Sequence, residues 1–350
     1  MRLIITILLT LGFIGCTETS GEVQVWPWED PVIEEIELPV PATLDKWTDV
    51  SADYGTLPEY IKVYKSPEKL EAKLAVAYIA VADMAAAQWD IWSISDVEMD
   101  GTEEAFKTPA AVYAEGTWPV VINAGFFYSS GGLNYSSSLA VRESEVLAYN
   151  INYASEDWVT LYYPTRAAFL ESESGEFNAC WTYKRNDSHY MYPSPAGNTW
   201  EARPAKTPSA TYPEGAETFA AKTAMGGGPL LIDGGKFKDT FVEELFNGAS
   251  GIAPDSDQPR TAIGVTADKK MITFVCEGRQ MTEGVAGLTT ADVANVLLDL
   301  GCVEAINLDG GGSSCMLINA TGPDLLHGKQ APLLSLEARI NSQSSLFKLC

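Results

Sequence analysis

Strand-length apolar runs that end in glycine-bearing polar turns are the feature that most constrains the fold of this chain. Five such turns occur, namely NAGFF (123–127), MGGGPLL (225–231), PRTAIG (259–264), CEGRQ (276–280) and LDGGGSS (308–314). Short apolar runs bounded by turn residues indicate buried strands, and glycine permits sharp turns and close backbone approach. The pattern therefore predicts a sheet-rich body whose polar side chains stand at strand ends.

One helix is well marked, in the stretch LTTADVANVLLDLG at 288–301. Thr289 or Thr290 can cap its start, an apolar face follows, and Gly301 ends it. The helix joins the strand that ends at Cys276 to the strand EAINL at 304–308, and this strand–helix–strand order predicts a parallel pair. The predicted fold class is α+β (mixed α/β), with a curved mixed β-sheet core, few helices and active-site loops at strand ends.

The chain of 350 residues, 46% of them hydrophobic, is long enough for one domain with appendages. Residues 1–15 (MRLIITILLTLGFIG) are typical of a signal peptide, and residues 16–59 are rich in proline and acid and predict a tether with an irregular lead-in. Residues 60–350 form the predicted domain. Within it, residues 150–218 lack a clear period and predict an insertion or long decorated loop, where recognition often resides.

The run FIGC directly before the tether resembles a bacterial lipoprotein signal, in which Cys16 becomes the lipidated N-terminus. We therefore predict an exported cell-envelope lipoprotein of the outer membrane, which contacts the membrane only through its N-terminal lipid. The alternative is an ordinary secretory signal in which Cys16 is incidental. No other segment is long and apolar enough to cross a membrane.

The net charge of −24 argues against nucleic acid as a partner. An anionic substrate would have to be met by locally placed arginines. The cysteines show no metal-ligand spacing, and two histidines are too few for a multi-histidine metal site. The pairing of Cys180, Cys276, Cys302, Cys315 and Cys350 and the oligomeric state stay open.

Two phosphate-binding motifs are excluded by the residues that come after the glycine runs. Neither run is followed by Lys and Ser or Thr at the spacing of a Walker loop. The DGGG run leads into an apolar strand and opens no helix, so a dinucleotide fold is not indicated.

The ordered set NAGFF, GGGP, RTAIG, GRQ and NLDGGGSS resembles the phosphodiester glycosidase family, over roughly Tyr60 to the C-terminus. The block from Arg260 to Met316 is the most specific part. The resemblance implies a hydrolase that cleaves sugar 1-phosphodiesters, such as N-acetylglucosamine-1-phosphodiester linkages, to free sugar and phosphomonoester. A phosphodiester-linked glycan would be its partner. Fold alone does not guarantee activity.

Matched onto the family, Asp309 is the first choice for the catalytic carboxylate and Glu277 the second, with Asn123 as a further catalytic residue. Glu277 stands where the family often has aspartate, which puts its reach in doubt. The predicted substrate-binding residues are Arg260, Arg279, Gly227, Gly228, Gly310, Gly311, Gly312 and Ser313. Arginine side chains and glycine amides match phosphate oxygens in geometry. A carboxylate can stabilise the positive charge that grows on the sugar, attack the anomeric carbon or activate water.

Structural readings compete with each of these assignments. Both arginines could pair with surface acids, Asn123 could support a turn, and Phe126 and Phe127 could be core residues. The sequence requires no cofactor, but Asp309 with Asn307 and Glu277 could ligate Ca²⁺ through hard oxygens. The alternative function is a non-catalytic, lipid-tethered glycan-binding surface protein with the same fold.

Overall fold

The computed structural model describes residues 44–93, 118–130, 133–202, 205–319 and 345–349, with positions 109 and 114. The predicted signal peptide, Cys16 and most of the predicted tether lie outside these residues. Among the described residues, no helix combines the length and the apolar character that a membrane crossing requires.

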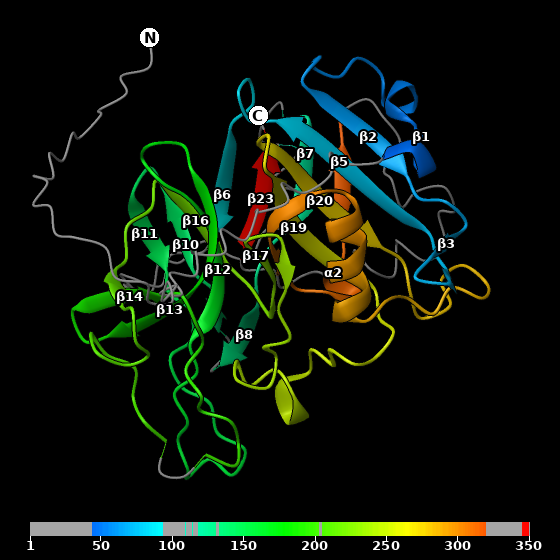
Figure 1. Cartoon of the computed structure of the whole chain (residues 1–350). Helices are drawn as coiled ribbons and strands as arrows, with labels where there is room; N and C mark the ends of the chain where they lie inside the picture. The colour runs from blue at the N-terminus through cyan, green and yellow to red at the C-terminus, as the bar shows by residue number, and fades with distance from the viewer. Residues whose placement is uncertain are drawn as a thin grey trace, which may run out of the picture. The chain divides into compact units, whose positions relative to one another are not determined.

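Three larger sheets and two hairpins form the described body (Figure 1). In the eight-stranded sheet the order is β1 (Thr48–Asp49), β2 (Ile61–Lys65), β5 (Ala77–Asp83), β20 (Lys270–Cys276), β19 (Arg260–Thr266), β21 (Cys302–Asn307), β17 (Leu230–Asp233) and β18 (Lys236–Phe237). The seven-stranded sheet has the order β11 (Glu145–Ala148), β10 (Ala140–Arg142), β16 (Thr223–Gly226), β12 (Arg166–Glu171), β13 (Phe177–Arg185), β14 (Ser188–Tyr192) and β15 (Glu217–Thr218).

The third sheet has the order β22 (Met316–Ile318), β7 (Val120–Asn123), β23 (Ser345–Leu349) and β6 (Trp89–Ser93). The hairpins are β3 (Lys69–Leu70) with β4 (Lys73–Leu74), and β8 (Phe127–Ser130) with β9 (Leu133–Ser136). Short 3₁₀ helices are η1 (Leu44–Lys46), η2 (Ser51–Tyr54), η3 (Gly248–Ser250) and η4 (Gly311–Ser313).

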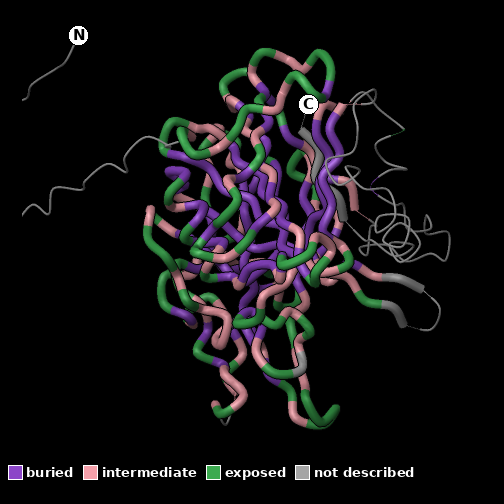
Figure 2. Tube along the Cα trace, turned by 90° about the vertical axis from the view of Figure 1, so that its right-hand side faces the viewer, coloured by how far each residue is buried: buried purple, intermediate pink, exposed green. Residues whose placement is uncertain are grey.

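The main core lies between the sheets, because alternate residues of their strands point to the same side. It holds Val63, Ile122, Phe169, Ile263 and Ile306, all of which are buried. In Figure 2 the buried segments run through the interior, and exposed residues gather at the turns. Strand β19 is buried along its whole length, because a second layer covers its other face.

That second layer is α2 (Thr290–Asp299), which lies over the eight-stranded sheet (Figure 1). Its buried Val293 and Leu297 pack with Ile272 and Phe274 of the sheet. Thr289 and Asp292 form a capping box at its start, which satisfies amides that the first turn leaves free. The predicted helix, its cap and its end before Gly301 are confirmed.

The predicted fold class needs correction. The described residues are mostly β, with antiparallel pairings that include a curled half-barrel, and they contain one bounded α-helix, so a mixed α/β class is wrong. The predicted parallel pair is also wrong, because β19 lies between β20 and β21 and is antiparallel to both. The hairpin β19–β20 places β19 in the position that a parallel neighbour would have taken. A curved β core with few helices is correct.

Residues 150–218 contain β12, β13, β14 and β15, which make up most of the seven-stranded sheet. Their periodicity was obscured because β12 is covered on both faces and its inner side carries small residues such as Ala167. Whether this segment is an insertion stays a prediction.

Candidate functional site

The register of the central strands brings the predicted loops to one edge of the eight-stranded sheet. Arg260 pairs with Cys276 and Ala262 pairs with Asn307, so β20 and β21 end where β19 begins. The residues after Cys276 and after Asn307 therefore emerge beside Arg260. Gly228 joins them, because its amide donates to the Asn307 carbonyl at 2.7 Å.

Asp309 follows β21 by two residues and is partly exposed to solvent. Its Oδ1 accepts a hydrogen bond from the Gly310 amide at 2.8 Å, and Ser313 donates a second one to the carboxylate. Desolvation outweighs these two donors and raises the pKa of Asp309 to about 6. A carboxyl group that changes charge near neutral pH is suited to proton transfer or charge stabilisation.

Asn123, at the end of β7, is buried at 1% exposure and contacts the backbone of the Asp309 loop. Its Nδ2 donates to the Asp309 carbonyl at 2.7 Å, while its Oδ1 accepts from Thr261 Oγ1 at 2.7 Å and from the Cys315 amide at 2.9 Å. These contacts give Asn123 a positioning role. The structure thus brings Asn123 and Asp309 together without directing the amide toward the carboxylate.

Arg260 is also buried, at 2% exposure, and its guanidinium faces backbone carbonyls. Its Nε donates to Leu288, its Nη1 to Ile252, and its Nη2 to both Ala253 and Ser256, over 2.6 to 2.9 Å. A two-pronged phosphate contact needs two adjacent N–H donors, and four of the five N–H donors of Arg260 already bond to carbonyls. The geometry therefore favours a positioning role for Arg260 as well.

Arg279 is exposed and has a left-handed φ of 55°. Its Nε donates to Gln258 Oε1 at 2.7 Å, and its guanidinium lies directly over Gly311, where an added Cβ would meet Nη2 at 2.8 Å. Neither Nη1 nor Nη2 has a hydrogen-bond partner in the described part of the chain. Arg279 therefore presents charge and donors beside the Asp309 loop, as a clamp requires.

Glu277, the second predicted carboxylate, lies at the same edge, and its Oε2 accepts from Thr282 Oγ1 at 2.7 Å. Its amide donates to the Val76 carbonyl at 2.9 Å. Among the described residues, Glu277 and Asp309 accept from different donors, so the structure places the two carboxylates on one edge but shows no donor that joins them.

The two glycine runs have different surroundings. Gly227 and Gly228 are buried, and an added Cβ would meet the Asn307 carbonyl at 2.4 Å or the Phe246 ring at 2.2 Å. These glycines permit close packing beneath the site. Gly312 is exposed, and an added Cβ there would meet no atom within 4 Å. Gly312 therefore forms the open part of the loop, whereas Gly310 lies against the Pro259 carbonyl and Gly311 against the Arg279 guanidinium.

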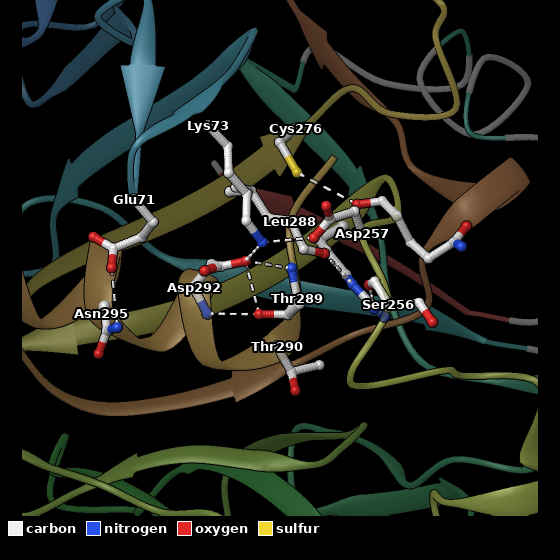
Figure 3. A network of polar contacts seen from close by, with 12 residues as sticks. Glu71, Lys73, Ser256, Asp257, Cys276, Leu288, Thr289, Thr290, Asp292 and Asn295 are labelled. Atoms are coloured by element: carbon white, nitrogen blue, oxygen red, sulfur yellow. Dashed lines mark hydrogen bonds and ion pairs between the residues drawn. The ribbon is translucent and has the colours of Figure 1, made fainter. Parts of the chain in front are cut away.

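Behind the site, Lys73 bridges two carboxylates (Figure 3). Its Nζ lies 2.6 Å from Asp257 Oδ1 and 2.6 Å from Asp292 Oδ2. Asp292 caps α2, and Asp257 precedes Gln258, the partner of Arg279. The lysine thus fastens the loop that holds Arg279 to the start of the helix.

No cluster of three or more His, Cys, Asp or Glu suited to a metal ion occurs among the residues that the structure describes. Asn307, a candidate calcium ligand, directs Nδ2 to the Gly228 and Leu308 carbonyls and has a buried Oδ1. Whether Asp309, Asn307 and Glu277 hold Ca²⁺ stays a prediction. Cys180, Cys276 and Cys302 are buried free thiols, and Cys315 is also buried.

One residue near the site was not predicted from the sequence. Arg166, at the start of β12, is buried at 8% exposure and lies on the Phe246 ring, with Cζ 4.0 Å from its centroid. The only sequence signal was a lone arginine at the head of an apolar run, in PTRAAFL.

The fold and the loop geometry define a protein of antiparallel sheets with a carboxylate, a glycine loop and an arginine at one sheet edge. The model of the phosphodiester glycosidase family matches residues 187–339. The catalytic domain of zebrafish N-acetylglucosamine-1-phosphodiester α-N-acetylglucosaminidase, auto-inhibited by its pro-peptide, is similar in structure. It has a TM-score of 0.51 and 15% identity, over 89% of this chain and 97% of that one. Residues 187–339 of the chain thus match the phosphodiester glycosidase family, and the likeness to the zebrafish domain is one of fold.

Two further similarities are more distant. A hypothetical protein from Synechocystis has a TM-score of 0.49 and 16% identity, over 84% of this chain and 64% of that one. The SPbeta prophage-derived uncharacterized protein YomE of Bacillus subtilis strain 168 is 39% identical over 56 residues, which are 16% of this chain and 8% of that protein. The alignments thus span less than two thirds of either relative.

Lys73→Met tests the bridge behind the site. Burial lowers the pKa of Lys73, but the Asp257 and Asp292 carboxylates raise it by more, so the pKa of Lys73 is raised overall. For Asp292, burial raises the pKa, but Lys73 and Thr289 lower it by more, so the pKa of Asp292 is lowered overall. The bridge therefore stabilises the fold between the unfolded pKa values of aspartate and lysine, about 4 and 10. We expect the variant to lose roughly 1 kcal/mol of unfolding free energy at pH 7 and less at pH 3, measured by urea denaturation. The exposed Lys236→Met serves as control; an equal loss in both variants would contradict the assignment.

Asp309→Asn tests the desolvation of the site carboxyl. Because the folded pKa of about 6 lies above the unfolded value of about 4, the contribution of Asp309 to stability is largest at low pH and is lost as the pH rises through 6. We expect the variant to be more stable than the wild type at pH 8, by about 1–2 kcal/mol, with the difference vanishing near pH 4. Thermal melts across this pH range measure it, with the exposed Asp187→Asn as control. A variant that is less stable at pH 8 would show that the carboxylate supports the fold.

Proposed function

We propose that this protein is an exported hydrolase that cleaves sugar 1-phosphodiesters, of the N-acetylglucosamine-1-phosphodiester type, to free sugar and phosphomonoester. The observation that carries the proposal is that one loop carries Asp309, whose pKa is raised to about 6, and Gly311, over which the Arg279 guanidinium lies. The family match supports the reaction class, and the substrate of the zebrafish relative suggests the sugar.

Cleavage of a sugar 1-phosphodiester needs a cation for the phosphate and a carboxylate for the sugar, and this sheet edge carries one of each. A phosphodiester leaves the anomeric carbon as a weakly basic anion, so the protein has to compensate negative charge more than it has to donate a proton. Arg279 offers Nη1 and Nη2 for that purpose, and the exposed amide of Gly312 adds a fixed dipole. On the sugar side, Asp309 as carboxylate would stabilise the developing cation, attack it or activate water.

Asn123 and Arg260 act in this proposal by holding the loop. Asn123 fixes the Asp309 carbonyl, and Arg260 fixes the carbonyls of the loop at 252–256 that leads to Gln258. Glu277 stays the second candidate for the carboxylate role, at the same edge.

The test is an assay of phosphomonoester release from α-linked N-acetylglucosamine 1-phosphodiesters. We expect Asp309→Asn to lower kcat by at least ~10³-fold while an uncleavable phosphonate analogue still binds, because the substitution removes charge and keeps size. Wild-type kcat/KM should fall as the pH drops below about 6, where Asp309 becomes protonated. Arg279→Lys should lose about 10-fold or more, since a lysine lacks the fork, whereas the exposed Arg185→Lys should not.

Two outcomes would count against this assignment. Full turnover by Asp309→Asn would exclude the carboxylate from the chemistry. Joint loss of binding and turnover in that variant, with both restored by added calcium, would make Asp309 a metal ligand.

The second candidate function is a glycan-binding protein without turnover. It is favoured by Trp158, which is 90% exposed at the tip of a turn that Asp157 holds through the Val159 and Thr160 amides. An exposed indole on an ordered turn is suited to pack against a sugar ring. Glycan binding that depends on Trp158, in a wild-type protein that releases no phosphomonoester, would favour this function.

We also propose that the mature protein is a cell-envelope lipoprotein of the outer membrane, because the short charged start, the apolar run and FIGC precede Cys16. Mass spectrometry of the membrane fraction should find a diacylated N-terminal Cys16, and Cys16→Ser should release the protein from that fraction. An unmodified Cys16 in the mature chain would refute the proposal.

A further inference from the structure

The guanidinium of Arg166 has no hydrogen-bond partner among the described residues. Its Nε and Nη1 are both buried without a partner, and the residue as a whole is 8% exposed. Burial lowers the pKa of Arg166 to about 10, which leaves the group charged at neutral pH. A buried cation with vacant donors is costly, and native proteins rarely keep one without a purpose.

The nearest acid does not satisfy it. Glu244 attracts Arg166 through space, but its oxygens accept from the Leu230 and Ala167 amides and from Thr240 Oγ1, at 2.9 to 3.0 Å. No hydrogen bond or short ion pair joins Arg166 to Glu244, both of which are described. Glu244 therefore compensates part of the charge and leaves the donors vacant.

Aromatic packing orients the guanidinium without using its donors. Phe246 lies against its face, and Phe126 lies next to Phe246 with ring centroids 5.4 Å apart. Stacking occupies the face of the planar group, while its five N–H bonds point outward in the plane. An acceptor could thus approach the edge of the fork with Phe246 still in place.

Short contacts connect this arginine to the Asp309 loop. The Phe246 ring packs on Gly228, whose carbonyl accepts from Asn307 Nδ2 at 2.8 Å, two residues before Asp309. Phe126 stands two residues after Ala124, whose carbonyl accepts from the Asp309 amide at 3.0 Å. Arg166 is therefore linked through Phe246 and Gly228 to the end of β21, the strand that Asp309 follows.

We propose that Arg166 is an oxyanion-binding residue of the site, whose vacant fork takes the phosphoryl oxygens of the substrate. The proposal rests on the proposed function for the identity of the anion. It assigns to Arg166 the two-pronged contact that Arg260, with its donors on four carbonyls, cannot make.

Calorimetric titration tests this without requiring turnover. The probes are an uncleavable phosphonate analogue of an α-N-acetylglucosamine 1-phosphodiester, the neutral methyl α-N-acetylglucosaminide, and inorganic phosphate. We expect Arg166→Met to weaken phosphonate binding by roughly 10- to 100-fold and Arg166→Lys by less, with the affinity for the neutral glycoside unchanged. The control, Arg185→Met, removes an exposed arginine and should change neither affinity.

Stability separates a binding role from a structural one. Because the Arg166 side chain makes no hydrogen bond to described residues, Arg166→Lys should melt within a few degrees of the wild type and should retain more affinity than Arg166→Met. Unfolding of both variants, or equal losses for the phosphonate and the neutral glycoside, would overturn the proposal. Loss of inorganic phosphate binding alone would also overturn it, since the fork would then hold only an adventitious anion.

The proposed function and this proposal fail in different ways. A wild-type protein that binds the phosphonate through Arg166 but cleaves no phosphodiester overturns the function and supports the anion site. A wild-type protein that cleaves while Arg166→Met binds and cleaves equally well overturns the anion site alone.

Discussion

The hydrogen bonds of the Asn123 side chain join the parts on which the site depends. Asn123 ends β7 in one sheet, Thr261 belongs to β19 in another, and Asp309 follows β21. One buried amide meets all three, because Nδ2 donates to the Asp309 carbonyl and Oδ1 accepts from Thr261 and from the Cys315 amide. An unpaired buried amide would be costly, so the three elements are held in one register and the glycine loop is left to turn outward.

Near the loop, burial desolvates two ionisable groups, Asp309 and Arg166, that the fold does not fully neutralise. Desolvation raises the pKa of Asp309 despite two donors, and Arg166 stays charged with a vacant fork. Each of these groups costs folding free energy, whereas Lys73 with its two carboxylates contributes some. Groups that oppose stability near one loop are typical of a functional site, since a ligand with an anionic group and a developing positive charge can satisfy both the arginine and the carboxylate.

The sequence predicted local structure well where one pattern decided it. Thr289, the apolar face and Gly301 defined α2. Strand order was not predictable in this way, because a helix between two strands permits either adjacent strands or strands separated by a third. The small inner residues of β12, such as Ala167, hid a strand that the core nevertheless covers on both sides.

The site arginines show why residue type and motif do not settle a role. Arg260 stands in the RTAIG motif, but the turns around it supply four carbonyls within reach, and its donors are used there. Arg166 stands in no motif, and its surroundings supply aromatic rings and one carboxylate that other donors already occupy. A guanidinium binds an anion only when its fork is vacant, which depends on the acceptors that distant segments bring to it. Glu244 lies far from Arg166 in the sequence, so folding decides which arginine is available for a phosphate.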